Sequence, residues 1–326
     1  MRSLRMMGLV IVMCGVAMAA EGANAPGASG KKPSLTEATA KLKVPPEWFE
    51  MTAITWDTNK PWKDARLEIR RLLGLDEQAV RQAVKLTWIY AQKSDIGNGH
   101  ELPMYLFMSG NYAWALQEYP KHLETVAGNG ATHEYLCLAS CYAHFGEYEK
   151  AMELLDRASK DLPPAPWEIS GQANIANSLG DLYVEMGQID QAKAAYAEAM
   201  RLYPTSAQPY GRHLLPRYVA KVKTKLDLLT FESLGTAKLR DGKYIGKALG
   251  YADTKDMQIT VTIKGGKMAD IQVVHQEKIE LNATQIIPEQ ILAKQSLKVD
   301  AITGATVTSQ AITDGTYQAL KQAGLK

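Results

Sequence analysis

Two segments, LASCYAHFGEYEKAMELLDRASKDLP (Leu138–Pro163) and LGDLYVEMGQIDQAKAAYAEAMRLYP (Leu179–Pro204), follow the same pattern 41 residues apart. They share a leucine, a tyrosine, a glycine, two alanines and a final proline at matching steps. In both, apolar residues recur every three or four positions, which is the period of an amphipathic helix. Small residues such as Ala151 and Ala192 let two helix backbones approach closely. Each segment therefore predicts a helix pair that buries its apolar face by stacking on a neighbour.

This spacing resembles the tetratricopeptide repeat, whose unit of about 34 residues has small residues where its helices cross. The insert PPAPWEI between the copies accounts for the longer spacing. Clear copies are predicted at about 132–165 and 173–206, and a weaker one at about 96–128. The segment YGRHLLPRYVAKVKTKLDLL is predicted to cap the array. The resemblance implies a concave face that docks a partner protein, and the alternative is an array that only supports the next domain.

The helical pattern extends toward the N-terminus, and a helical domain is predicted over residues 45–230. Asp64 and Asp76 are predicted N-caps there, and Gly74 is a predicted helix end. Residues 20–44 are rich in Ala, Gly, Lys, Ser and Pro, which is typical of a flexible linker.

The first residues have the composition of an export signal. Arg2 and Arg5 precede the uncharged run GLVIVMCGVAMAA, which ends in the small-residue site Ala17-Met18-Ala19. A basic start, a short apolar run and an A-x-A site describe a secretory signal peptide, predicted over residues 1–19. The run is shorter than the roughly 20 apolar residues of a membrane span, although an uncleaved anchor stays open. The protein is therefore expected to be exported, periplasmic or extracytoplasmic, and soluble or membrane-associated.

Composition and spacing exclude several functions. The chain of 326 residues has 37 Lys+Arg against 35 Asp+Glu, which gives no electrostatic case for nucleic acid, where a clustered basic face is expected. The loose basic segment AKVKTKL is interpreted as the polar face of a helix. Cys137 and Cys141 lie four residues apart on a predicted helix, which favours packing roles although export permits a disulfide. The six histidines show no paired spacing, so no protein-bound metal or haem is predicted. P-loop, nucleophile-elbow and dinucleotide-binding motifs are also absent from the sequence.

The pattern changes near residue 239. MQITVTI alternates apolar and polar residues, KGGK supplies a two-glycine turn, and MADIQVV follows, which together predict a β-hairpin. NATQIIPEQILAKQ is helix or loop, and VDAITGATVTS is loop. The last segment is a predicted helix with Ser309 or Thr308 as its N-cap and Gly324 as its end. The predicted fold class is multidomain: an all-α repeat region followed by a small α+β domain over residues 239–326.

Within that loop, DAITGAT contains Asp300, Thr303, Gly304, Ala305 and Thr306. The order of DGKYIGKALGY, the hairpin and this motif resembles the FMN-binding domain of the C subunit of sodium-pumping NADH:quinone oxidoreductase and of the Rnf G subunit. The resemblance covers about the last 90 residues, and Thr303 replaces the more usual serine. It implies FMN as cofactor, attached to Thr306 through a phosphoester bond by a flavin transferase after export.

The residue types suit that role. A hydroxyl forms a stable phosphate ester, Gly304 and Ala305 add little bulk, and the positive end of the following helix favours a phosphate. Thr308 and Ser309 are candidate hydrogen-bond donors to the phosphate, and Asp300 has an implied role in recognition by the transferase. Weaker candidates for contacts to the isoalloxazine ring lie in the strands: Tyr244, Tyr251, His275 and Glu277. Without its context, the loop reads as an ordinary turn and helix cap.

Three functions follow from these features. The leading hypothesis is an exported electron carrier whose repeats dock a redox partner. Such a carrier could associate with a membrane redox complex. The second is a scaffold or assembly protein with a structural FMN domain, and the third is an enzyme with non-covalent FMN. Nothing in the sequence supplies a second active site, so an electron-transfer protein is favoured over a stand-alone enzyme.

Overall fold

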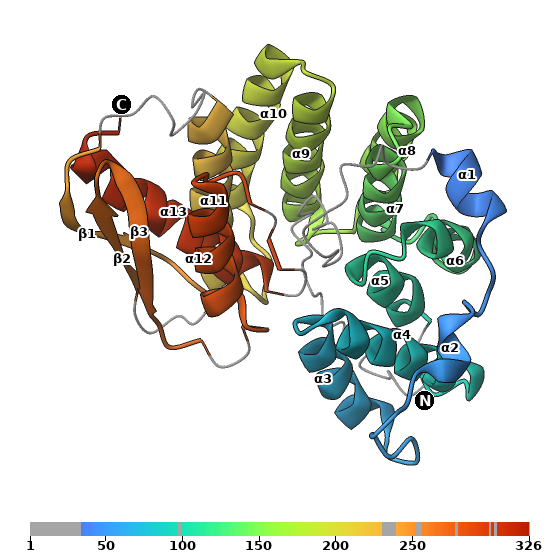
Figure 1. Ribbon diagram of the computed structural model, residues 1–326. Coiled ribbons are helices and arrows are strands. Elements are labelled where there is room, and N and C mark those ends of the chain that lie inside the picture. Colours follow the sequence, from blue (N-terminus) through green and yellow to red (C-terminus); the bar gives the residue numbers. More distant parts are fainter. Residues whose placement is uncertain are drawn as a thin grey trace.

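The computed structural model describes residues 34–96, 99–229, 239–251, 256–277, 280–299, 301–302 and 305–325. Helices form the first part of the chain, and a three-stranded sheet with two helices forms the second (Figure 1). This confirms the predicted fold class. The predicted signal peptide lies outside the described residues. Across the described ranges, no helix combines the length and the apolar character that a bilayer crossing needs.

Four helices open the described chain: α1 (Leu35–Ala40), α2 (Trp48–Met51), α3 (Trp62–Leu73) and α4 (Glu77–Gln92). The prediction of a flexible linker over residues 20–44 is wrong for α1, because Ser34 and Glu37 form a capping box that starts this helix. Asp76 caps α4 and Gly74 ends α3, as predicted. Asp64 is not an N-cap, since α3 already begins after Pro61.

The next six helices form three antiparallel pairs: α5 (Glu101–Met108) with α6 (Tyr112–Val126), α7 (Thr132–His144) with α8 (Tyr148–Lys160), and α9 (Glu168–Glu185) with α10 (Ile189–Leu202). Gly110, Gly146 and Gly187 end the first helix of each pair with φ values of 75°, 76° and 73°. A glycine adopts this left-handed conformation without strain. The three pairs therefore share one helix–turn–helix geometry, and the weaker copy has the same turn as the clear ones.

Small residues lie at the helix crossings of the repeats. A Cβ atom added to Gly180 would lie 2.3 Å from the ring of Tyr196, and Ala151 and Ala192 are fully buried. The thiols of Cys137 and Cys141 form no disulfide and are buried in the core that contains Ala151, as their packing interpretation predicted. The stack is held together by close backbone approach and apolar burial, which the aligned sequence pattern anticipated.

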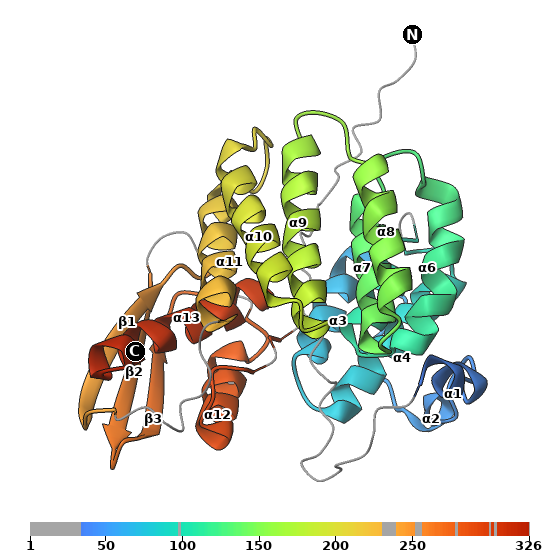
Figure 2. The ribbon, with the colours of Figure 1, turned by 90° about the horizontal axis from the view of Figure 1, so that it is seen from above.

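Helix α11 (Leu215–Leu229) follows the 3-10 turns Tyr203–Thr205 and Arg212–Leu214 and covers α10. In Figure 2, α8, α9, α10 and α11 stand side by side, and the sheet lies beyond α11. The helix caps the array as predicted, but it also packs against the last helix of the chain. Arg217 strengthens this junction, because its Nε donates to the carbonyl of Gly250. Helix α11 therefore packs against both the helical region and the C-terminal domain.

The sheet contains β1 (Gly242–Ala248), β2 (Met257–Lys264) and β3 (Lys267–Val274) in antiparallel order β1-β2-β3. The predicted hairpin is confirmed, with Gly265 and Gly266 at φ 59° and 73°. The Asp241 carboxylate accepts hydrogen bonds from both glycine N–H groups, at 2.9 and 3.0 Å. These contacts fix the turn and thereby the register of the two strands.

Two helices cover the sheet: α12 (Ala283–Lys294) against β3, and α13 (Thr306–Ala323) against β1 and β2. A Cβ atom at Gly246 of β1 would lie 1.8 Å from the carbonyl oxygen of Gly315 in α13. At Gly315, a Cβ atom would lie 2.3 Å from Cδ1 of Ile259. The helix backbone therefore rests directly on the strand, which sets where the first turn of α13 lies.

Candidate functional site

The start of α13 differs from the predicted start. The helix begins at Thr306 with Ala305 at the N-cap position, so the prediction of Ser309 or Thr308 as N-cap is wrong. The reason is that Ser309 makes other bonds: its Oγ accepts from the N–H of Ile302 and donates to the carbonyl of Ala305, both at 2.9 Å. This hydroxyl ties the preceding loop to the first turn. The end of the helix at Gly324 is confirmed, with φ 108°.

Thr306 is therefore the first residue of an 18-residue helix. The first N–H groups of a helix have no partner inside it, and they carry the positive end of the helix dipole. A phosphate near Thr306 would meet these groups. Asp300, Thr303 and Gly304 lie outside the described residues, as does the side chain of Thr306. Ala305 is described and buried.

Four other predicted site residues come together beside this first turn. Glu277 Oε2 accepts from the Thr308 hydroxyl at 2.6 Å and from the N–H of Tyr251 at 3.1 Å. The N–H of Glu277 donates to His275 Nδ1 at 3.2 Å. Glu277 thus joins the segments that follow β1 and β3 to the start of α13. The Thr308 and Ser309 side chains are buried and hydrogen-bonded within the protein.

Tyr244 does not join this group. Its hydroxyl donates to the carbonyl of Asp241 at 3.4 Å, and its Cα pairs with Val261 in the sheet. Tyr244 lies within β1, whereas Tyr251 lies three residues after the end of that strand. Tyr251 is 55% exposed, and its ring meets the His213 ring edge-on at 6.4 Å between centroids.

The contact between Thr308 and Glu277 makes a testable contribution to stability. Because a hydrogen bond to a charged group contributes about 1.5–3 kcal/mol, Thr308→Val should lower the free energy of unfolding by that amount. Urea titration followed by circular dichroism measures it. Thr316→Val is the matched control, since Thr316 is equally buried but donates only to the helix carbonyl of Ile312. Equal losses in the two variants would contradict a special role for the Glu277 contact.

Two hollows lie in this part of the protein, and the first of them reaches the start of α13. The first, of about 190 Å³, lies between α11 and the loop before α13, and its lining includes Lys221, Lys225, Lys298, Val299 and Ser309. The second, of about 400 Å³, lies at the end of the sheet and is lined by Lys247, Asp256, Gln258, Val274, His275 and Gln276. The sequence pattern did not reveal the lysines of α11 as part of a site, because it assigned them to the polar face of a helix.

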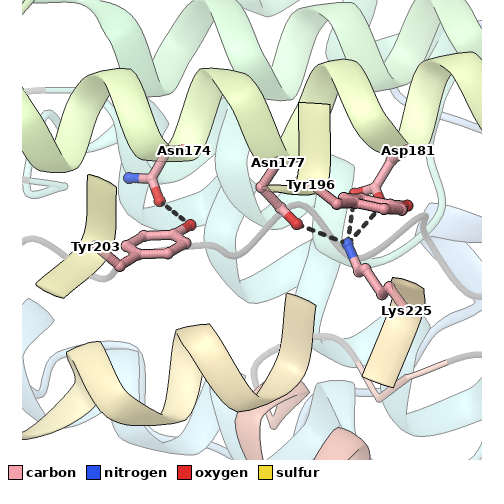
Figure 3. Close-up of polar contacts among 6 residues, drawn as sticks. All are labelled: Asn174, Asn177, Asp181, Tyr196, Tyr203 and Lys225. Atoms are coloured by element: carbon pink, nitrogen blue, oxygen red, sulfur yellow. Dashed lines mark hydrogen bonds and ion pairs between the residues drawn. The ribbon is translucent and has the colours of Figure 1, made fainter. Parts of the chain in front are cut away.

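Lys225 of α11 is part of a polar cluster with residues of the last repeat (Figure 3). Its Nζ lies 2.5 and 2.7 Å from the two carboxylate oxygens of Asp181 and 3.1 Å from Oδ1 of Asn177. The Tyr196 hydroxyl donates to Asp181 at 2.7 Å. Burial, and then the Asp181 charge, raises the pKa of Tyr196, so this hydroxyl stays protonated. The cluster joins α9, α10 and α11 beside the first hollow.

Two parts of the chain match known protein families. Residues 250–321 match the FMN-binding domain family, and residues 173–206 match the tetratricopeptide repeat family. NADH:acrylate oxidoreductase of Vibrio harveyi is 40% identical over 90 residues, which are 27% of this chain and 9% of that protein. The chain thus spans a small part of this curated relative. No solved structure matches the chain.

These matches define a flavin-binding protein. The chain carries a C-terminal FMN-binding domain behind a helical region that contains tetratricopeptide repeats, and FMN is its cofactor. The structure fits this cofactor in two respects: a helix N-terminus lies within the matched segment, and a hollow of about 400 Å³ lies beside His275. Strand β1 lies before the matched residues, yet it completes the sheet.

Proposed function

We propose that this protein is an extracytoplasmic electron carrier that holds FMN through a phosphoester bond to Thr306. The observation that carries the proposal is the position of Thr306 at the first turn of α13, inside the segment that matches the FMN-binding family. FMN exchanges one or two electrons, and the surrounding protein tunes it through charges and hydrogen bonds. The basic, apolar and A-x-A pattern of residues 1–19 supports export.

The residues of this chain divide the work of holding the flavin. The first N–H groups of α13 would face the phosphate, as helix N-termini do for anions. Glu277 holds the segment after β1 to the start of α13 through Tyr251 and Thr308. His275 and the exposed ring of Tyr251 lie near this end of the sheet, where an isoalloxazine ring would have room. These contacts would fix the ring relative to its point of attachment.

The repeats support the second part of the proposal, which is that they dock a redox partner. Stacked helix pairs form extended surfaces suited to protein partners, and α11 joins this stack to the FMN-binding domain. The Vibrio harveyi relative is named as an oxidoreductase of NADH and acrylate. We assign to the shared segment the part that carries electrons, and a flavin transferase would load it. Association with a membrane redox complex is one setting for such a carrier.

Intact mass of the exported chain tests the covalent bond. Coexpression with an active flavin transferase should add the mass of one FMN minus water, and the flavin should stay fluorescent on a denaturing gel. Thr306→Ala should remove the added mass and the fluorescence completely, whereas Thr303→Ser should retain both. Unmodified mass with flavin released on denaturation would show a non-covalent cofactor instead. Retention of the added mass in Thr306→Ala would place the attachment at another hydroxyl.

A further inference from the structure

Three helix ends meet in the first two helix pairs of the repeat region. His100 immediately precedes α5, His122 lies near the end of α6, and Glu134 lies in the first turn of α7. Glu134 Oε1 is 3.1 Å from His100 Nδ1 and 3.7 Å from His122 Nε2. The candidate ligand atoms of all three residues lie within 4.8 Å of one another. The fold therefore gathers two imidazoles and a carboxylate at one point.

The cluster is sheltered from solvent. The exposed fractions of the His100, His122 and Glu134 side chains are 21%, 6% and 14%. Nε2 of His122 is buried and has no hydrogen-bond partner, because Glu134 Oε1 is too far away for one. A buried polar atom without a partner is unfavourable by about 1–3 kcal/mol. An ion pair between His100 and Glu134 alone leaves this nitrogen unsatisfied.

We propose that His100 Nδ1, His122 Nε2 and Glu134 Oε1 bind one divalent transition-metal ion of the zinc class. Ligands about 2.0–2.1 Å from a tetrahedral Zn²⁺ lie roughly 3.3 Å apart, and the separations of Glu134 Oε1 from the two histidine nitrogens, 3.1 and 3.7 Å, bracket that value. Two imidazoles and one carboxylate suit Zn²⁺ or Fe²⁺, whereas Ca²⁺ and Mg²⁺ select oxygen ligands. An ion here would also satisfy the unpaired nitrogen of His122.

Three protein ligands leave one coordination position for water or another small ligand. Neighbouring groups surround the site: the His133 ring centroid lies 5.0 Å from that of His100, and His133 Nε2 lies 3.7 Å from Cys137 Sγ. An ion at this point would join α5, α6 and α7, which belong to two successive helix pairs. The sequence prediction of no metal rested on close spacing, and these ligands are 22 and 12 residues apart.

Zinc binding to the full chain, prepared without a histidine tag and stripped of metal, tests the proposal. Native mass spectrometry should show one Zn²⁺ per chain, and calorimetric titration with Zn²⁺ gives the affinity. His122→Gln and Glu134→Gln should each weaken binding at least about 100-fold, because loss of supporting groups alone weakens metal sites about 10- to 100-fold. His213→Gln is the matched control, since His213 is exposed and lies in a different part of the chain. Cys137→Ala should retain the affinity.

Thermal unfolding provides a second readout, because an ion that binds the folded state stabilises it. Zn²⁺ should raise the Tm of the wild-type chain and of His213→Gln, but not that of His122→Gln. Should His122→Gln fail to fold, the more exposed His100→Gln tests the same ligand set. Absence of bound Zn²⁺, or wild-type affinity in the ligand variants, would overturn the proposal. The cluster would then be an ion pair of His100 with Glu134. Since the site is separate from the flavin loop, Thr306→Ala should bind Zn²⁺ normally.

Discussion

Replacing Lys225 with methionine is expected to lower the free energy of unfolding by about 3–5 kcal/mol, the range for removal of one partner from a buried ion pair. The Lys225 and Asp181 side chains are only 18% and 8% exposed. Methionine keeps most of the apolar volume of the lysine stem but removes the charge. The Asp181 carboxylate then stays buried with the Tyr196 hydroxyl but without a cation.

Lys223→Met is the matched control for this effect. Lys223 lies on the same helix and pairs with Asp227 at 2.7 Å, but the two side chains are 53% and 27% exposed. Exposed pairs contribute about 0–1 kcal/mol, so this variant should change stability little. Guanidinium titration followed by helical circular dichroism compares the two. If the free energy of unfolding fell equally in both variants, the Asp181 cluster would not be what holds α9, α10 and α11 together.

Gly246→Ala is expected to destabilise the FMN-binding domain by about 3 kcal/mol, at the upper end of the range for overpacking. The added Cβ would lie 1.8 Å from the carbonyl oxygen of Gly315, which is backbone and has no rotamer to change. Either β1 or α13 must move away. Because α13 carries Thr306, the same substitution should reduce flavin loading.

Lys243→Ala, on the same strand, separates this clash from a general effect of changing β1. Lys243 is exposed, so its loss should alter stability by less than about 0.5 kcal/mol. Denaturant titration measures both variants, and in-gel flavin fluorescence measures loading. Wild-type stability in Gly246→Ala would show that the helix does not rest on the strand as closely as described.

The fold was predictable where local signals agree with packing. The Gly265–Gly266 turn and the alternation before and after it are short-range features, so the hairpin follows from them. The repeat pattern likewise predicted helix pairs, because each pair uses the same glycine turn. Helix ends were harder to predict when a side chain had two available roles. Ser309 is a good N-cap by type, but it bonds to Ile302 and Ala305 instead.

The candidate site divides in the same way. Thr306 was singled out by a contiguous motif, but the sequence pattern left it in the loop before the predicted helix and not in the first turn of α13. The contacts of Glu277 with Tyr251 and Thr308 join three distant segments, so no local pattern could pair them. The buried pair of Lys225 with Asp181 was hidden for the same reason. A lysine in an amphipathic helix reads as solvent-facing until the partner helix is known.

Helix α11 packs against α10 on one side and α13 on the other. In the proposed carrier, this shared helix removes the freedom that a swinging redox domain would use to search for its partner. A protein bound to the repeats would meet the flavin at one distance and one orientation. The rate of electron exchange would then depend on how the partner docks. Substitutions on the repeat surface would change which partner binds without altering the flavin.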